Sequence, residues 1–542
     1  MKQMEPPLLP RRDIEALIAD GAMIFILDQF VIKANAWAPY HPGGDMAILH
    51  MIGRDATDEV TALHSAETKQ LMLSRYRIGR IQGRWTNFTP PIQGGKFRSL
   101  SDAESKYDSA SSDESRGASL VFDSDSSTLR HRRGKAPSSL ASVTSVSSTE
   151  EDDSMAHLDT VTHEKITLDL EKYPALDYAT QDAIVAKYRL LNERIIAEGL
   201  YRCNYRAYGI EAIRISLLFI CMLLALHWGR YGVSGAFMGA VWQQLVFIGH
   251  DAAHMGITHS FHIDTCIGIF IGDYLGGLSI GWWKRNHNVH HIVTNAPEHD
   301  PDIEYLPFLA LSHRFFGSLR STYYNHVMKY DAVAKIAVKF QHYSFYPLMT
   351  IGRFNLYRLA WYYLLSSQPP RKGPAWWHWY LEMLGQLFFW TWYGYLILYK
   401  SIPTTSGRLA FFLVSHMITA PLHVQFTVSH FAMSTADLGP SESFPQKMLR
   451  TTMDVDCPQW LDFFHGGLQF QVIHHLFPRV PRHNLRKVQK MVMQFCDEMG
   501  IPYALYGFVN GNQRVVGKLA EISRQAAILA KCQEAMAVGL VH

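Results

Sequence analysis

The chain has 542 residues, which is long enough for several domains. Its formal net charge of +3 is close to neutral, so composition favours no nucleic-acid partner. The six cysteines are scattered without a Cys-x-x-Cys pair, which argues against a disulfide framework and a zinc ribbon and favours a reducing compartment. The first residues hold no apolar run of the kind that a cleaved signal peptide needs.

The first segment, residues 8–84, is predicted to form a small domain. Apolar side chains at helical spacing predict a helix over residues 11–18, and residues 23–32 are typical of two strands around a turn. His41 follows, with a proline and two glycines that let the backbone turn close to a flat ligand. A second histidine, His64, could face it. Two histidines on opposite walls can hold a haem iron, and such a haem transfers electrons because no position is left open for oxygen.

Four short motifs of this segment resemble those of the cytochrome b5 haem-binding domain. They are His-Pro-Gly-Gly at 41–44, Gly-Arg-Asp-Ala-Thr at 53–57, Leu-His-Ser at 63–65 and Tyr-Arg-Ile-Gly at 76–79. The resemblance implies an α+β fold and one haem b with His41 and His64 as axial ligands. His50 is a rival for the second ligand, but it lies close to His41 in sequence and is expected on the intervening helix.

Residues 85–160 are predicted to be a linker. The segment is rich in serine and contains a basic run at 130–133 and an acidic run at 150–153. Such a composition cannot bury a core, so disorder is expected. The linker would tether the N-terminal domain near its partner at a raised effective concentration.

Three histidine boxes lie far apart in the rest of the chain, each beside an apolar stretch. Residues three and four apart share one face of a helix, so each box would point its side chains the same way. Imidazole suits iron, copper and zinc, and ionisable groups beside membrane segments tend to be functional. The sequence therefore predicts a polynuclear metal site at a membrane surface. The boxes comprise His250 and His254; His287, His290 and His291; and Gln471, His474 and His475.

Apolar stretches predict an integral membrane domain over residues 161–510, followed by a helix and tail at 511–542. Too few residues separate the first two boxes for two full spans, so residues 263–283 should enter the membrane and return. Residues 343–365 contain arginines and are expected to lie as a helix in the interface. With four spans, all boxes lie on the face that carries the N-terminal domain, and the reducing environment makes that face cytosolic. The predicted spans are 215–226, 233–249, 376–399 and 409–428.

The boxes, spaced HxxxH, HxxHH and QxxHH, are similar to those of the membrane fatty-acyl desaturases. The fused cytochrome b5 domain and the glutamine narrow the resemblance to the front-end group, which includes the sphingolipid long-chain-base 8-desaturases. The runs at 294–306 and 463–478 agree with this group. The serine-rich insertion and the length resemble its fungal sphingolipid members.

This resemblance implies an all-α membrane domain of about four transmembrane helices under a cytosolic di-iron cap. The seven box histidines would hold two Fe ions. His430, which follows the last predicted span, joins the set because a histidine at this place does so in the wider superfamily. Gln471 is included as well, as a weak ligand or a hydrogen-bond partner of a metal-bound water.

The implied activity is oxygen-dependent desaturation of the sphingoid base of ceramide at carbon 8, in the endoplasmic reticulum membrane. The sequence has no Gly-x-Gly-x-x-Gly fingerprint, so NADH would deliver electrons through a separate NADH-cytochrome b5 reductase. Three alternatives stay open. They are a front-end acyl-lipid or acyl-CoA desaturase acting at position 5 or 6, a b5-fused lipid hydroxylase, and a membrane-anchored haem electron carrier whose boxes are structural or bind zinc.

Other histidines are expected to be structural. His465 departs from the small residue expected in relatives, and we expect it to lie on a helix surface rather than beside the metals. The remaining structural candidates are His259, His262, His299, His416 and His423.

Overall fold

The computed structural model describes residues 6–88 and 147–539. The N-terminal domain is a four-stranded sheet in the order β1-β4-β3-β2, with β1 parallel to β4 and the other pairs antiparallel. The predicted helix and two strands are present. Its elements are β1 (Leu8–Leu9), α1 (Arg11–Ala19), β2 (Ile24–Leu27), β3 (Phe30–Lys33), η1 (Ala38–Tyr40), α2 (Asp45–Leu49), α3 (Thr57–Leu63), η2 (Thr68–Met72), η3 (Leu73–Tyr76) and β4 (Arg77–Ile81).

The core of this domain continues past the predicted boundary at residue 84. Ile14 and Ile18 of α1 pack on the inward side chains of β2 and β3, and Trp85 and Phe88 belong to the same buried cluster. The indole Nε1 of Trp85 donates to the carbonyl of Gly53 at 3.0 Å. These two aromatic side chains therefore close the domain rather than begin a linker.

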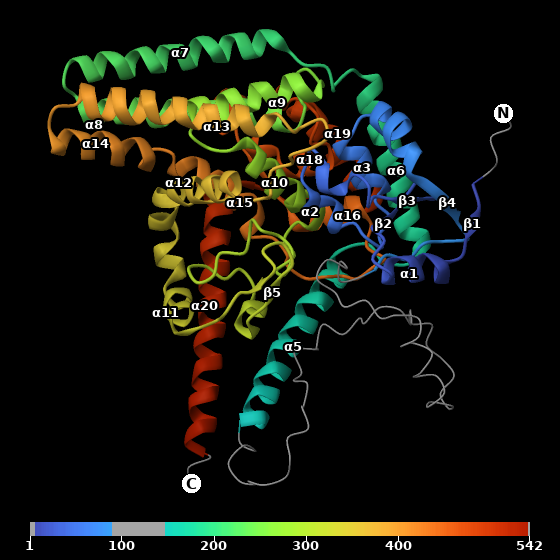
Figure 1. The fold of residues 1–542 in the computed structure, drawn as a ribbon. Helices are drawn as coiled ribbons and strands as arrows, with labels where there is room; N and C mark the ends of the chain where they lie inside the picture. Colours follow the sequence, from blue (N-terminus) through green and yellow to red (C-terminus); the bar gives the residue numbers. More distant parts are fainter. Residues whose placement is uncertain (1–5, 89–146, 540–542) are drawn as a thin grey trace, which may run out of the picture.

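Most of the predicted linker, residues 89–146, lies outside the described residues. Its last part differs from the expectation, because helix α5 (Ser147–Lys172) begins inside it. α5 and the long helix α20 (Phe508–Gly539) extend together from the body of the molecule (Figure 1). Leu158 of α5 and Ile522 of α20 share a buried cluster with Phe315. α20 begins at Phe508, inside the predicted membrane domain, and takes the place of the helix and tail predicted at 511–542.

Apolar helical segments, most of them long, form one layer (Figure 1). In it, α7 packs on α8, α8 packs on α14, and α13 packs on η4. Gly235 and Gly239 of α8 meet the α14 backbone so closely that an added Cβ would lie 2.6 Å from a carbonyl oxygen. The layer contains α7 (Tyr205–His227), α8 (Tyr231–Ala253), α9 (Phe261–Ile269), η4 (Phe270–Leu275), α13 (His378–Phe389), η6 (Trp390–Ser401) and α14 (Thr405–Met417).

Three helical stretches among the described residues are long and apolar enough to cross a membrane: Tyr205–His227, Tyr231–Ala253 and Thr405–Phe431. A fourth crossing would require the pair Phe261–Leu275 and Ile280–Val293, which is bent by 117°, to count as one span. That bend agrees with the predicted entry and return of residues 263–283. The predicted span 376–399 is helical but is not among the three, and it carries buried Glu382 and Gln386.

Boxes two and three lie on α10 and α18, among the elements beneath this layer (Figure 1), whereas box one lies at the C-terminal end of α8, a helix of the layer itself. Residues 343–365, predicted to be helical, fall within α12. The remaining elements are α6 (Tyr178–Ala197), α10 (Ile280–Val293), η5 (His313–Gly317), β5 (Arg320–Ser321), β6 (His326–Val327), α11 (Ala332–Lys339), α12 (Gln341–Leu365), α15 (Ala420–Phe431), α16 (Phe444–Thr451), β7 (Asp454–Asp456), η7 (Gln459–Leu461), α17 (Asp462–His465), η8 (Leu468–Phe470), α18 (Gln471–Leu476), η9 (Arg482–Asn484), α19 (Leu485–Met499) and β8 (Leu505–Gly507).

Candidate metal centre and haem site

His41 and His64 face one another across the N-terminal domain, with ring centroids 5.9 Å apart. His41 Nδ1 donates to the carbonyl of Gly44 at 2.9 Å, and His64 Nδ1 donates to that of Val60 at 3.3 Å. Each ring therefore keeps Nε2 as a bare acceptor. Burial lowers the pKa of His64 to about 3, so its ring is neutral, as a metal ligand must be. Because metal–imidazole bonds are about 2 Å long, two rings at this separation could both bind one iron placed between them.

The rival ligand His50 is occupied at both ring nitrogens. Its Nδ1 donates to the carbonyl of Met46 at 2.7 Å, and its Nε2 lies 2.8 Å from the hydroxyl of Thr322. No nitrogen is left for a haem iron.

The box histidines converge into two adjacent groups. The first group takes its side chains from α8, α10 and α18, and the second from α10, α15 and α18. Within each group the candidate ligand atoms all lie within 4.8 Å of one another, close enough to share an ion. The first group is His250, His254, His287 and His474; the second is His290, His430 and His475.

His291 lies between the two groups. Its ring centroid is 4.7 Å from that of His474 and 4.3 Å from that of His475. Its Nε2 lies 3.1 Å from Nε2 of His287. Two imidazole nitrogens bound to one ion at about 2.1 Å would be about 3.0 Å apart in an octahedral site and about 3.4 Å apart in a tetrahedral one. The facing nitrogens therefore match a metal site.

Five of these histidines bury a ring nitrogen that has no hydrogen-bond partner among residues 6–88 and 147–539. Buried polar atoms almost always have partners, so a concentration of orphans indicates a missing bound species. These nitrogens are soft enough for iron, copper or zinc. They are Nε2 of His254, Nδ1 of His291, Nδ1 of His430, Nε2 of His474 and Nε2 of His475.

Polar side chains orient histidines of boxes two and three. His290 Nδ1 donates to Asp300 Oδ2 at 2.8 Å, and His287 Nδ1 lies 3.6 Å from Asp302 Oδ2. His475 Nδ1 donates to the hydroxyl of Thr294 at 3.3 Å. Such contacts on Nδ1 direct Nε2 at a metal. Asp300 and Asp302 were not predicted to have roles, although the Asp-Pro-Asp sequence just after box two was the available signal.

Box one has a similar carboxylate. Asp251 accepts hydrogen bonds from Tyr208 and Arg482, and its Oδ1 lies 4.0 Å from Nδ1 of His250. Tyr208 comes from α7 and Arg482 from η9, so the first box is joined to the membrane layer and to the segment after the third box.

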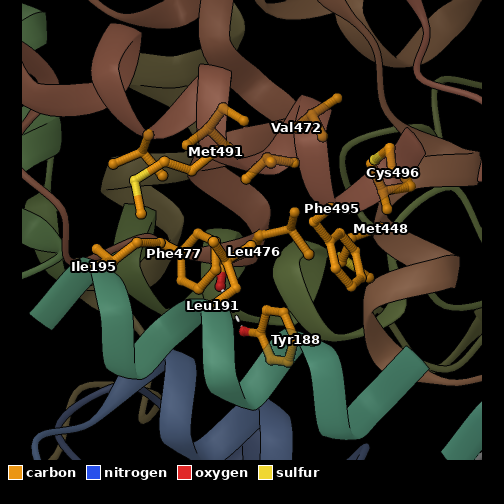
Figure 2. Packing of buried hydrophobic residues seen from close by; sticks show 14 of the residues in the cluster. Tyr188, Leu191, Ile195, Met448, Val472, Leu476, Phe477, Met491, Phe495 and Cys496 are labelled. Carbon is orange, nitrogen blue, oxygen red and sulfur yellow. Dashed lines mark hydrogen bonds between the residues drawn. The ribbon is translucent and has the colours of Figure 1, made fainter. Parts of the chain in front are cut away.

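The third box is positioned by long-range packing. Figure 2 shows Val472, Leu476 and Phe477 enclosed between α6 and α19, with the hydroxyl of Tyr188 donating to the carbonyl of Leu476 at 2.8 Å. Asp454 of β7 accepts from the backbone N–H of Val472 at 2.8 Å, in the first turn of α18. Together these contacts hold the short helix that carries His474 and His475.

Gln471 and His430 lie beside each other. Both are buried, and their side chains are close enough to interact. His430 belongs to the second group, and Gln471 lies next to it at the start of α18.

The expectation that His465 lies on a helix surface was wrong. The side chain is buried, its Nδ1 lies 3.3 Å from Gln425 Nε2, and Phe508 of α20 packs against it. It is outside both histidine groups. His259, His416 and His423 each donate to a backbone carbonyl, as structural histidines do.

Comparison with known proteins agrees with this geometry. Residues 226–507 match the fatty acid desaturase family, and residues 11–82 match the cytochrome b5-like haem/steroid-binding domain. The chain is 57% identical over 530 residues to the Delta 8-(E)-sphingolipid desaturase of Emericella nidulans, covering 98% of this chain and 97% of that one. Identity to the protein of the same name is 46% over 548 residues in Kluyveromyces lactis, covering 98% and 95% of the two chains. In Candida albicans it is 44% over 564 residues, covering 96% of each. The chain therefore belongs to the fatty acid desaturase family, and its N-terminal domain belongs to the cytochrome b5-like haem-binding family.

Proposed function

We propose that this protein is a sphingolipid 8-desaturase, which introduces an E double bond at carbon 8 of the sphingoid base of ceramide. The observation that carries the proposal is the pair of adjacent histidine groups under the membrane layer, in the same chain as a haem domain. The names of the relatives support the substrate and the E geometry.

The residues at the two groups would hold two iron ions. His250, His254, His287 and His474 would bind the first. His290, His430 and His475 would bind the second, with His291 between them and Gln471 beside His430. Zinc would suit the same nitrogens, but zinc has no redox chemistry and could not accept electrons from a fused haem domain.

The reaction balances as one dioxygen, two electrons and two protons consumed for each double bond and two waters formed. The lipid loses two vicinal hydrogen atoms and so provides the other two electrons. Dioxygen reduced at the iron pair would supply the oxidant, since no acid–base side chain removes hydrogen from an unactivated methylene. The protein's own part is to hold eight imidazoles, to orient them through Asp251, Asp300 and Asp302, and to keep the centre dry.

The electrons would reach the centre through haem b, held by His41 and His64. NADH-cytochrome b5 reductase would reduce that haem from outside the chain. All six cysteines are free, which supports a reducing compartment and hence a cytosolic haem domain and metal cap on the endoplasmic reticulum membrane.

The test is expression in a host that lacks 8-unsaturated sphingoid bases, followed by profiling of long-chain bases and fatty acids. An 8-E base in cells with the wild type, and its loss with His290→Ala, is the expected result. His326→Ala is the control, because His326 is exposed and far from both groups in sequence. Unsaturation in fatty acids alone, a hydroxylated base alone, or no lipid change in cells containing the haem-loaded wild type would overturn the proposal.

A further inference from the structure

Helix α10 presents two faces to two different partners. One face carries His287, His290 and His291 into the metal groups. The other face carries Arg285, Asn288 and Val289 toward the haem domain. Each helical residue is turned by about 100° from the one before it, so the two sets of side chains are centred on opposite sides of α10.

Polar contacts join this second face to the loop after the haem ligand His41. Asn288 Nδ2 donates to the carbonyl of Gly43 at 2.9 Å. Arg285 Nε donates to Asp45 Oδ1, also at 2.9 Å. His287 of the metal centre adjoins Asn288 in sequence, so one hydrogen bond connects the haem-ligand loop to the box-two helix.

The two glycines of the loop permit this approach. A Cβ on Gly43 would lie 2.8 Å from Asn288 Nδ2, and one on Gly44 would lie 2.7 Å from Arg285 Cγ. Real Cβ atoms do not come so close to other atoms, so a larger residue at Gly44 would press on the backbone of α10, and one at Gly43 would displace the side chain of Asn288.

Apolar packing completes the contact. Val289, Ile292 and Val293 of α10 are buried in one cluster with Met46 and Ile48 of α2. Arg285 is nearly fully buried, and Asp45 is half-exposed at the rim. A hydrogen-bonded charge pair across a contact fixes the register between the two surfaces and disfavours other arrangements.

We propose that α10 is a shared wall between the two redox sites, and that the Asp45–Arg285 pair and the Asn288–Gly43 hydrogen bond hold the haem domain in its electron-transferring position. Arg285, Asn288 and Asp45 are positioning residues, which act on the rate of transfer through the placement of the haem loop. The inference rests on the proposed function. Each transfer would move one electron from the reduced haem held by His41 and His64 to the metal centre, two such transfers would be needed for each double bond, and the reductase would restore the haem each time.

The test uses the full-length protein loaded with haem and iron. The haem is reduced without oxygen and then mixed with oxygen and ceramide, and its reoxidation is followed by absorbance. His290→Ala gives the background rate that does not pass through the centre. Arg285→Asp and Asp45→Arg are compared singly and together, because a reversed pair can restore the attraction. The matched control is Arg84→Asp with Asp182→Arg, an exposed ion pair between the haem domain and α6.

Each single reversal is expected to slow reoxidation by about tenfold or more, since it places two like charges opposite each other at the contact. The double reversal is expected to recover most of the rate. Haem absorbance and the rate of haem reduction by the reductase should stay as in the wild type, as should all rates of the control. Asp45→Asn gives a milder variant where a reversal fails to fold, and slower reoxidation is expected there too.

Wild-type reoxidation rates in haem-loaded Arg285→Asp or Asp45→Asn would overturn the proposal, as would a double reversal no faster than either single one. Formation of the 8-unsaturated base by the wild type in the same mixture tests the proposed function separately. Failure of that product would refute the desaturase assignment, whereas failure of the rate differences alone would refute only the shared wall.

Discussion

His290 Nδ1 donates to Asp300 Oδ2 at 2.8 Å, and both side chains are buried. Asp300 in turn accepts backbone N–H bonds from Asn295 at 2.7 Å and from Asp302 at 2.9 Å. The turn after α10 thus holds the Asp300 carboxylate in place, and the carboxylate orients the imidazole of His290. A histidine oriented in this way offers its other nitrogen at a set angle.

Replacement of this carboxylate should weaken the second metal group while sparing the first. For Asp300→Ala we expect iron affinity at that group to fall by about 10- to 100-fold, the usual cost of losing such a partner. Non-haem iron per chain, measured by elemental analysis after dialysis, should fall from about two toward one, with the haem content unchanged. Asp456→Ala is the control, since Asp456 is exposed. Retention of both ions in Asp300→Ala would contradict this role.

The haem-ligand assignment is tested by two histidines of the same domain. We expect His64→Ala to lose the absorbance of a bis-histidine haem and to lose desaturation, with non-haem iron retained. His50→Gln should keep the haem, because both nitrogens of His50 contact protein atoms rather than the space between His41 and His64. Optical spectra of the purified variants decide the matter. Loss of the haem in His50→Gln and its retention in His64→Ala would exchange the two roles.

Asp454 should give the structure a pH dependence of its own. Burial raises its pKa to about 7, although hydrogen bonds from Tyr503, Val472 and Gln489 oppose the shift. The unfolded value is about 4, so the stability contributed by this group is complete below about pH 4 and is lost as the pH rises through about 7. Asp454→Asn removes that titration. The amide NH2 group of the new side chain would face hydrogen-bond donors, which should lower the free energy of unfolding by roughly 1–3 kcal/mol.

The melting temperatures of the wild type and of Asp454→Asn, taken from pH 5 to pH 8 in one detergent, test this. The wild type should melt higher at pH 5, and the gap should narrow toward pH 8. A gap that widens with pH would show that the carboxylate is stabilised in its ionised form. Asp456→Asn serves as the exposed control on the same strand.

The sequence was sufficient for features set by local spacing. His287, His290 and His291 lie on one face of α10 because the helical repeat requires it, and the bend between η4 and α10 followed from the short distance between the first two boxes. The haem-domain strands were likewise evident from alternating apolar residues and a turn.

Features set by distant partners could not be read in this way. His465 is buried because Gln425 and Phe508 cover it from other elements. Asp454 lies in a three-residue strand and reaches the third box only through the folded chain. The predicted span 376–399 was inferred from its apolar residues, but its Glu382 accepts from Ser279 Oγ and the Gly281 N–H at the start of α10, contacts that no local pattern reveals.

Replacement of Gly44, in the loop after His41, should have a larger effect than replacement of Gly83, a second glycine of the haem domain. Gly44 has φ +93° and Gly83 has φ +77°, so alanine at either position strains the backbone, by about 1–3 kcal/mol. Only at Gly44 would the new methyl group also meet α10, 3.0 Å from the Cα of Arg285, whereas Gly83 faces open space. Gly44→Ala should therefore lower the melting temperature more than Gly83→Ala and should slow haem reoxidation, which Gly83→Ala should leave unchanged. Thermal melts and reoxidation traces of the two haem-loaded variants provide the comparison, and equal behaviour in both measurements would show that the loop does not press on α10.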